Sequence, residues 1–327
     1  MGRLKQTAHA LAAAACALAL CCAAGAHAQA YPAKPLRYLV TGSPGSGADT
    51  LGRLIADGLS QALGRQVIVE NRAGGGSNLA AELVARAAPD GYTVLQNTIT
   101  QAVNVTLYRN LNYDLLRDFA PVTQLATGPA VLVVHPSLPV KTLAELLKLA
   151  KARPGDLNYA SGGTGTFTFL AMELRKGQAR INLMHVPYRG GGAALHAILS
   201  GEVSVYFAPV GVALPNIQEQ RLRALAVSTA RRVPLTPELP TIAEAGLPGY
   251  ESGNWYGMVL PVKTPPEVSA VLCAAVLSVL VNPVTARRMN DFGYVPVGNT
   301  PDEYTAYIRR EIERLGKIVR AFNLKPD

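Results

Sequence analysis

The segment LRYLVTGSPGSGADTLGRLIADGLSQALGRQVIVE, residues 36–70, predicts a complete strand–helix–strand unit. Residues 36–41 form a short apolar run that stops at Gly42-Ser43-Pro44-Gly45, as a buried strand does where it enters a turn. Over 48–63 the apolar residues recur at helical spacing, and 66–70 is again apolar. Parallel strands joined by a crossover helix are the expected product.

The same alternation continues along the rest of the chain. A helix over 79–88 and a strand over 93–96 complete a βαβαβ pattern, which predicts a parallel sheet. The further predicted strands are 131–134, 158–160, 182–186, 203–207, 222–227 and 258–260, and the further predicted helices are 143–152, 167–176, 193–200, 268–281, 284–291 and 301–322. The pattern predicts an α/β protein with two α/β units, one of which contains both ends of the chain.

Composition narrows the class of protein. The chain has 327 residues, enough for two domains, and it is 49% hydrophobic but only 16% charged, which excludes disorder as its main state. The net charge is +9, but Lys and Arg are scattered and never form a run longer than two. Nucleic-acid binders concentrate basic residues in a stripe. We therefore expect no nucleic-acid partner, and a mild positive field suits a small anionic ligand.

Residues 1–30 have the pattern of a secretory signal. Arg3 and Lys5 precede an apolar stretch over 10–24, and Ala28-Gln29-Ala30 satisfies the small-x-small cleavage rule. A retained membrane anchor is the alternative, but the apolar stretch is shorter than the roughly 20 residues that span a bilayer. The sequence thus predicts export to the periplasm with cleavage near residue 30, which leaves Cys273 as the single cysteine and no internal disulfide.

Three glycine-rich loops each follow a predicted strand and open a predicted helix. They are 44–49 (PGSGAD), 74–78 (GGGSN) and 161–166 (SGGTGT). Glycine lets the backbone approach a ligand, and a helix N-terminus presents free N–H groups to an anion. The simpler interpretation is an ordinary strand-to-helix turn, with Ser46 and Asp49 forming a capping box.

Known catalytic and cofactor motifs are missing from this sequence. No loop matches the phosphate-binding G-x-x-x-x-G-K-[ST] pattern or the dinucleotide pattern G-x-G-x-x-G. The histidines after residue 30, His135, His185 and His196, are isolated, and neither metal-ligand spacing nor a nucleophile motif is present. We therefore predict no cofactor, no metal and no catalysis.

The loops occur together with a series of ordered segments that resemble one known family. These segments are YPAKP (31–35), VENRAGGG (69–76), APDGYT (88–93), DFAPVT (118–123), LNYAS (157–161), HVPYRG (185–190), LRALAV (222–227), LPTIAEAG (239–246) and WYG (255–257). In this order they resemble the Bug family, the TctC-like extracytoplasmic solute receptors of tripartite tricarboxylate transporters.

The resemblance implies a periplasmic-binding-protein fold of the type II kind. Two α/β lobes with mixed or parallel sheets would be joined by a hinge of two strands. Residues 31–125 would form the first part of lobe 1, 126–227 would form lobe 2, and 228–327 would return to lobe 1. It also implies a monomer that binds a small organic anion and works with the membrane subunits of a transporter.

The family pattern places the ligand carboxylate between the first and third loops. The residues carried over are Pro44, Gly45, Ser46, Gly47 and Asp49 in one lobe, and Ser161, Gly163, Thr164, Gly165 and Thr166 in the other. Family members that bind amino acids often have an Asp where this chain has Ala208, and Phe167 makes the third loop more apolar. These departures predict a carboxylate without an amino group, such as a dicarboxylate or an aromatic acid.

Two other functions stay open at this level. One is a secreted α/β enzyme that uses a glycine-rich anion site, and the other is a ligand sensor for a two-component system.

Overall fold

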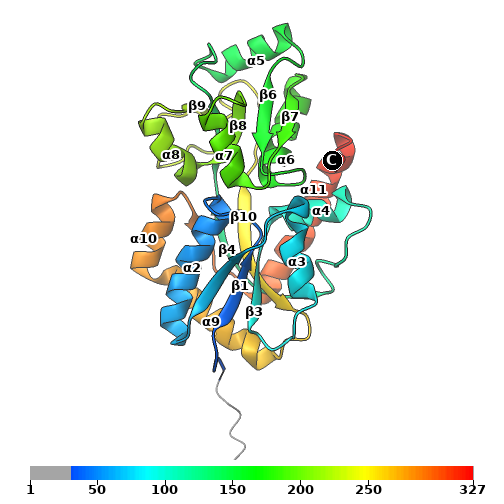
Figure 1. The fold of residues 1–327 in the computed structure, drawn as a ribbon, viewed down its shortest axis with the longest axis vertical. Coiled ribbons are helices and arrows are strands. Elements are labelled where there is room, and N and C mark those ends of the chain that lie inside the picture. Colours follow the sequence, from blue (N-terminus) through cyan, green and yellow to red (C-terminus); the bar gives the residue numbers. More distant parts are fainter. Residues whose placement is uncertain (1–30, 327) are drawn as a thin grey trace, which may run out of the picture. The chain divides into compact units, whose positions relative to one another are not determined.

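A computed structural model of the chain describes residues 31–326, so the predicted signal over 1–30 lies outside the described residues. The elements given below all belong to one compact unit, Lys34–Asp327. This unit contains two sheets, each covered by helices (Figure 1). We call the part built around the six-stranded sheet the first lobe and the part built around the five-stranded sheet the second lobe.

The first lobe has a mixed sheet in the order β11-β4-β10-β3-β1-β2. Its strands are β1 (Leu36–Val40), β2 (Val67–Asn71), β3 (Thr93–Thr98), β4 (Phe119–Gly128), β10 (Asn254–Pro261) and β11 (Val295–Pro296). β1 runs parallel to β2 and β3, as the βαβαβ pattern predicts, whereas β10 lies antiparallel between β3 and β4.

Helices cover both faces of this sheet (Figure 1). The first-lobe helices are α2 (Gly47–Leu63), the 3₁₀ turn η1 (Gly75–Ser77), α3 (Asn78–Ala85), α4 (Ile99–Leu107), α9 (Pro266–Val281), α10 (Pro283–Asp291) and α11 (Pro301–Ala321). α2 shows why they form: Leu51, Ile55 and Leu59 recur every four residues and are buried, and Gly64 at φ 61° ends the helix.

The second lobe has a sheet in the order β7-β6-β8-β5-β9. Its strands are β5 (Ala130–Val134), β6 (Asn158–Ser161), β7 (Met184–Pro187), β8 (Val205–Pro209) and β9 (Arg223–Val227), and its helices are α5 (Leu143–Ala152), α6 (Phe167–Ala179), α7 (Gly191–Leu199) and α8 (Val210–Gln218). β6 is parallel to β7 and β8, and β5 is antiparallel to β8 and β9. Alternating residues of β5 enter two separate apolar clusters, so both faces of the sheet are buried at this central strand.

The chain passes between the lobes twice, once from β4 through Pro129 into β5 and once between β9 and β10. The two passages are hydrogen-bonded to each other. The Ala130 N–H donates to Ser228 Oγ (3.1 Å), and the Ser228 N–H donates to the Ala130 carbonyl (2.8 Å). Ser228 is fully buried, so this pairing is a compact hinge element.

Several elements differ from the sequence-based expectations. β4, α4 and α8 were not predicted: α4 is rich in β-branched residues, which favour strands, and α8 contains Pro215, which normally breaks a helix. β8 runs over Val205–Pro209 instead of 203–207, so Ala208 lies within the strand and not after it.

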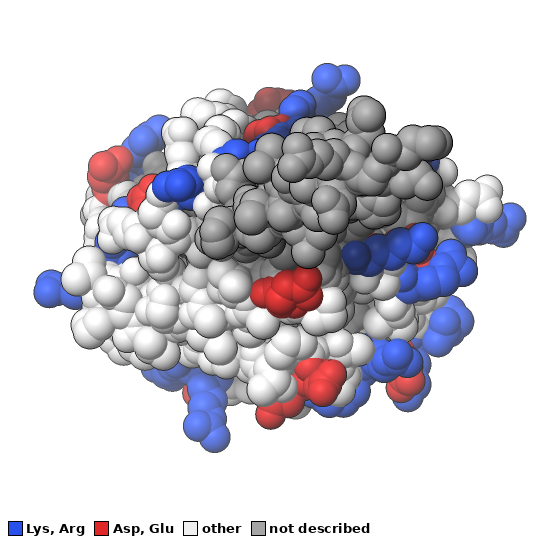
Figure 2. All heavy atoms as spheres, turned by 90° about the horizontal axis from the view of Figure 1, so that it is seen from below, with Lys and Arg blue, Asp and Glu red and all other residues white. Residues whose placement is uncertain are grey.

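Charge and apolar surface give two further observations. On the face in Figure 2, Lys and Arg lie at several places around the edge, with Asp and Glu among them. Among residues 31–326, no single helix is both long and apolar enough to cross a bilayer; the bent pair α9 and α10 passes that test on length and composition alone.

A guanidinium group is buried inside the second lobe. Arg175 of α6 is fully buried, and its Nη2 donates to the Met172 sulfur at 3.5 Å. Its Nε and Nη1 have no partner among the described residues. Burial lowers the pKa of Arg175 to about 10 because the charged form loses hydration. The buried, unpaired guanidinium of Arg175 therefore lowers the free energy of unfolding.

We predict that Arg175→Met raises the free energy of unfolding by about 1–3 kcal/mol, because it removes an unpaired buried charge at similar volume. Urea unfolding followed by circular dichroism measures the change. Arg314→Met is the matched control, because Arg314 is paired with the buried Glu311 (2.7 Å), and its loss should destabilise the protein. A clear loss of stability in Arg175→Met would contradict the prediction.

Candidate functional site

A cavity lies where the two lobes face each other. Its space free of protein atoms is about 660 Å³, part of it open to solvent. The lining comes from both lobes and consists of Thr41, Gly42, Ser46, Gly47, Ala48, Ala73, Gly74, Ser77, Thr98, Thr100, Gly162, Thr166, Phe167, Thr168, Gly190, Gly191, Tyr206, Pro209, Val212, Asn254 and Tyr256. None of these described lining residues is charged, and hydroxyl groups dominate their polar atoms.

Six α-helices begin at this cavity. The N-cap residues of α2, α3, α4, α6, α7 and α8 all belong to the lining and are, in that order, Ser46, Ser77, Thr98, Thr166, Gly190 and Pro209. α4 is closed by a capping box with Gln101, whereas α3, α6, α7 and α8 have no side-chain cap. The first-turn N–H groups of a helix and the positive end of its dipole favour an anion.

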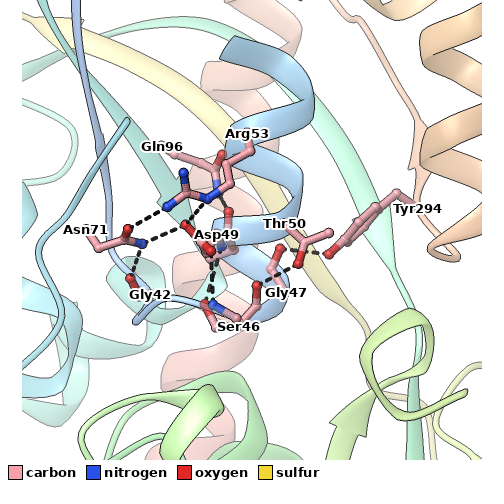
Figure 3. Close-up of polar contacts among 11 residues, drawn as sticks. Gly42, Ser46, Gly47, Asp49, Thr50, Arg53, Asn71, Gln96 and Tyr294 are labelled. Atoms are coloured by element: carbon pink, nitrogen blue, oxygen red, sulfur yellow. Dashed lines mark hydrogen bonds and ion pairs between the residues drawn. The ribbon is translucent and has the colours of Figure 1, made fainter. Parts of the chain in front are cut away.

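The loop before α2 is held by the Asp49 carboxylate (Figure 3). Asp49 Oδ2 accepts the Gly45 N–H (2.9 Å), while Oδ1 accepts from Asn71 Nδ2 (2.9 Å) and pairs with Arg53 (3.0 Å). Ser46 Oγ caps the helix by accepting the Asp49 N–H (3.3 Å). The expected capping box is thus only half right, because the carboxylate binds Gly45 and not Ser46. Asp49 shapes the loop and does not line the cavity.

Asp49 stays ionised in this setting. Burial opposes ionisation and raises its pKa, but hydrogen bonds from Arg53, Gly45 and Asn71 outweigh burial and hold the pKa below its ordinary value. A depressed pKa means that the carboxylate stabilises the fold above the ordinary Asp pKa, and that this contribution disappears as the pH falls through the lowered value.

The loop before α6 uses its polar groups internally. Ser161 Oγ accepts the Gly163 N–H (3.0 Å) and bonds to His185 Nε2 (2.6 Å), and Ser161 is fully buried. Thr166 Oγ1 donates to the Gly163 carbonyl (2.6 Å). The loop is therefore a rigid turn that carries Thr166 and Phe167 to the cavity.

The structure places the predicted site residues in two groups. Ser46 and Gly47 of the first lobe and Thr166 and Phe167 of the second line one cavity. The lining does not include Pro44, Gly45, Asp49, Ser161, Gly163, Thr164, Gly165 or Ala208. Ala208 is fully buried in β8 opposite Val131, so the next residue, Pro209, reaches the cavity instead.

Other lining residues escaped the sequence argument. Tyr206 and Tyr256 lie on strands of different lobes; the Tyr206 hydroxyl donates to the Gly191 carbonyl at 3.3 Å. Asn254 begins β10, far along the chain from every loop considered. Thr98 could have been found, because Thr98 with Gln101 matches the capping-box pattern that marks a helix start.

The lobes also touch beside the cavity. The Gly192 N–H of α7 donates to Ser43 Oγ of the first loop at 3.3 Å. A Cβ at Gly47 would lie 3.1 Å from Pro209 Cγ and 3.0 Å from the Tyr256 hydroxyl. The α2 start therefore sits directly against the second lobe.

Comparison with known proteins identifies the family of this chain. The model of the tripartite tricarboxylate transporter family receptors, TctC, matches residues 51–324. The chain belongs to this family. The Bug and TctC-like assignment and the two-lobed periplasmic-binding-protein fold predicted from the sequence are both confirmed.

Three solved structures illustrate the relationship. R. palustris Rpa4515 with adipate is 34% identical, has a TM-score of 0.88, and covers 91% of this chain and 100% of its own. MatC from Rhodopseudomonas palustris with bound malate is 31% identical, with a TM-score of 0.84 and coverages of 88% and 100%. The periplasmic binding protein BugD is 27% identical, with a TM-score of 0.88 and coverages of 91% and 100%.

We predict that Asp49→Asn lowers the free energy of unfolding by about 1–3 kcal/mol at pH 7, because it removes charged hydrogen bonds. The deficit should shrink as the pH falls below the ordinary Asp pKa, since wild type then loses the same contribution. Urea unfolding of both proteins between pH 7 and pH 3 measures this, and a deficit independent of pH would show that the charge of Asp49 is not involved.

Proposed function

We propose that this chain is a periplasmic receptor that closes its two lobes around a small organic carboxylate without an amino group. A dicarboxylate or an aromatic acid is the favoured class, and the bound receptor delivers it to the membrane subunits of a tripartite tricarboxylate-type transporter. The carrying observation is the uncharged cavity at which helices from both lobes begin.

The chemistry of the cavity supports an acid group. A buried carboxylate must be hydrogen-bonded to offset its lost hydration. Backbone N–H groups at the starts of α2, α6 and α7 and the hydroxyl of Ser46 supply donors without a basic side chain. Ser46, Gly47, Thr166 and Phe167 would touch the ligand, while Asp49, Ser161 and the flanking loop residues hold these turns in place.

The same lining argues against an amino acid ligand. An ammonium group needs an acceptor of opposite charge when it is buried. The lining described here contains no Asp or Glu, and the nearby Asp49 carboxylate is already bound to Arg53, Asn71 and Gly45. Rpa4515 with adipate and MatC with malate are consistent with a non-amino acid.

The lobe boundaries belong to the same proposal. Residues 31–125 and 228–327 would form lobe 1, and 126–227 would form lobe 2. Support comes from the sheets, because β1–β4, β10 and β11 pair with each other and β5–β9 pair with each other. The first boundary moves by three residues, because Ala126–Gly128 at the end of β4 still pair with β10. Closure would then turn on the two passages tied by Ala130 and Ser228.

One contact favours the enzyme alternative, namely the short bond between Ser161 and His185. A nucleophile has to be reachable by its substrate. Ser161 is fully buried, already accepts the Gly163 N–H, and does not line the cavity. The pair therefore fits a structural role, in line with a binding protein.

Calorimetric titration tests the ligand class. We expect micromolar or tighter binding for at least one of succinate, adipate, malate and benzoate, and weak or no binding for aspartate and glutamate. The monoamide of the preferred acid should bind at least tenfold more weakly if the lost charge sat at the helix starts. Tight aspartate or glutamate binding without any organic-acid binding would refute the proposal.

Gly47→Ala tests whether the acid is held between closing lobes. The added Cβ would press on Pro209 of the second lobe and on the buried Tyr256 hydroxyl of its own lobe, so affinity for the preferred acid should fall about tenfold, with only a modest loss of unfolding stability. Gly253→Ala is the control, because its Cβ would meet nothing within 4 Å. Unchanged affinity in Gly47→Ala would argue against closure at this point.

A further inference from the structure

The second glycine-rich loop, 74–78, has a different role from the other two loops. The side chain of Asn104, on α4, is fully buried and holds the backbone of this loop. Asn104 Nδ2 donates to the Gly76 carbonyl and to Asn78 Oδ1, both at 2.8 Å. The Tyr113 hydroxyl also donates to Asn78 Oδ1 (2.7 Å). The loop and α4 thus form one rigid platform in the first lobe.

The third loop of the second lobe rests on this platform. A Cβ at Gly165 would lie 2.4 Å from Asn104 Oδ1, and a Cβ at Gly76 would lie 3.0 Å from the Thr164 carbonyl oxygen. The lobes can approach this closely because Gly165 has no side chain. Its φ of +83° also favours glycine. Asn104 Oδ1 is buried and has no hydrogen-bond donor among the described residues.

This contact lies beside the proposed ligand. Gly74 and Ser77 of the platform line the cavity, and Thr166, one residue after Gly165, is the N-cap of α6. The atom that faces Gly165 is an acceptor, and the hydrogen that a Cβ would replace points toward it, which is the geometry of a Cα–H···O contact. A contact that holds Gly165 in place would therefore also hold the start of α6 in place.

We propose that Asn104 and Gly165 form a lobe-to-lobe lock, in which Asn104 is a positioning residue that seats the α6 start over the cavity. The second glycine-rich loop serves as the platform of this lock. The role of the lock in ligand capture rests on the proposed function, whereas the contact itself does not.

A double-mutant cycle between Asn104→Ala and Gly165→Ala tests the lock. When Asn104 is present, the Cβ that Gly165→Ala adds collides with Asn104 Oδ1. Asn104→Ala removes this oxygen and relieves the collision. Leu107 Cδ2, 3.0 Å from the same Cβ, leaves a residual effect. The strain of φ +83° is present in both backgrounds and cancels, so the cycle isolates the contact between the lobes.

Gly163→Ala is the matched control. It also has positive φ (+110°), but the nearest atom to its Cβ is the Tyr188 carbonyl oxygen at 3.4 Å, within the same lobe. Its effect should be the same with and without Asn104.

Two readouts separate this inference from the proposed function. The urea midpoint of the free protein needs no ligand; Gly165→Ala should lower it less in Asn104→Ala than in wild type. Affinity for malate and adipate gives the second readout, where we expect Gly165→Ala to cost about 30-fold in wild type and under about fivefold in Asn104→Ala. If neither these two acids nor the other organic acids of the titration bind, the proposed function fails, and the urea cycle still decides the lock. Equal effects of Gly165→Ala in both backgrounds would overturn it.

Discussion

A carboxylate that leaves water must find hydrogen-bond donors, and on the proposed function they come from helix starts in two different lobes. α2 contributes from the first lobe, and α6 and α7 contribute from the second, around a lining without a charged side chain. Neither lobe alone encloses the space. On the proposed function, binding and closure are therefore one event, because an acid group is fully satisfied only when both sets of donors face it.

The rest of the structure supports this arrangement by keeping charge out of the cavity. Asp49, in the first turn of α2, is neutralised by Arg53 and bound by Asn71, so it organises the first loop without repelling an anion. Ser161 and Thr166 satisfy the backbone of the third loop in a similar way. The Ala130–Ser228 pairing joins the two passages between lobes, and on the proposed function the lobes would close about it.

The local sequence was sufficient to locate the first loop of the cavity, but not the lining residues that come from distant strands. The strand–loop–helix over 36–63 follows from apolar spacing and glycine, so the loop containing Ser46 and Gly47 could be located directly. Tyr206, Tyr256 and Asn254 could not, because they reach the cavity only through the pairing of β8 and β10 with distant strands. Ala208 shows the converse error: one misplaced strand end turned a core residue into a candidate ligand contact.

A crystal structure of the receptor grown with adipate or malate tests the central claim most directly. The account predicts one carboxylate in the cavity, with its oxygens about 3 Å from backbone N–H groups at the start of α2 and at the start of α6 or α7, and without a Lys or Arg side chain on it. A carboxylate paired with a basic side chain, or held by one lobe alone, would contradict it.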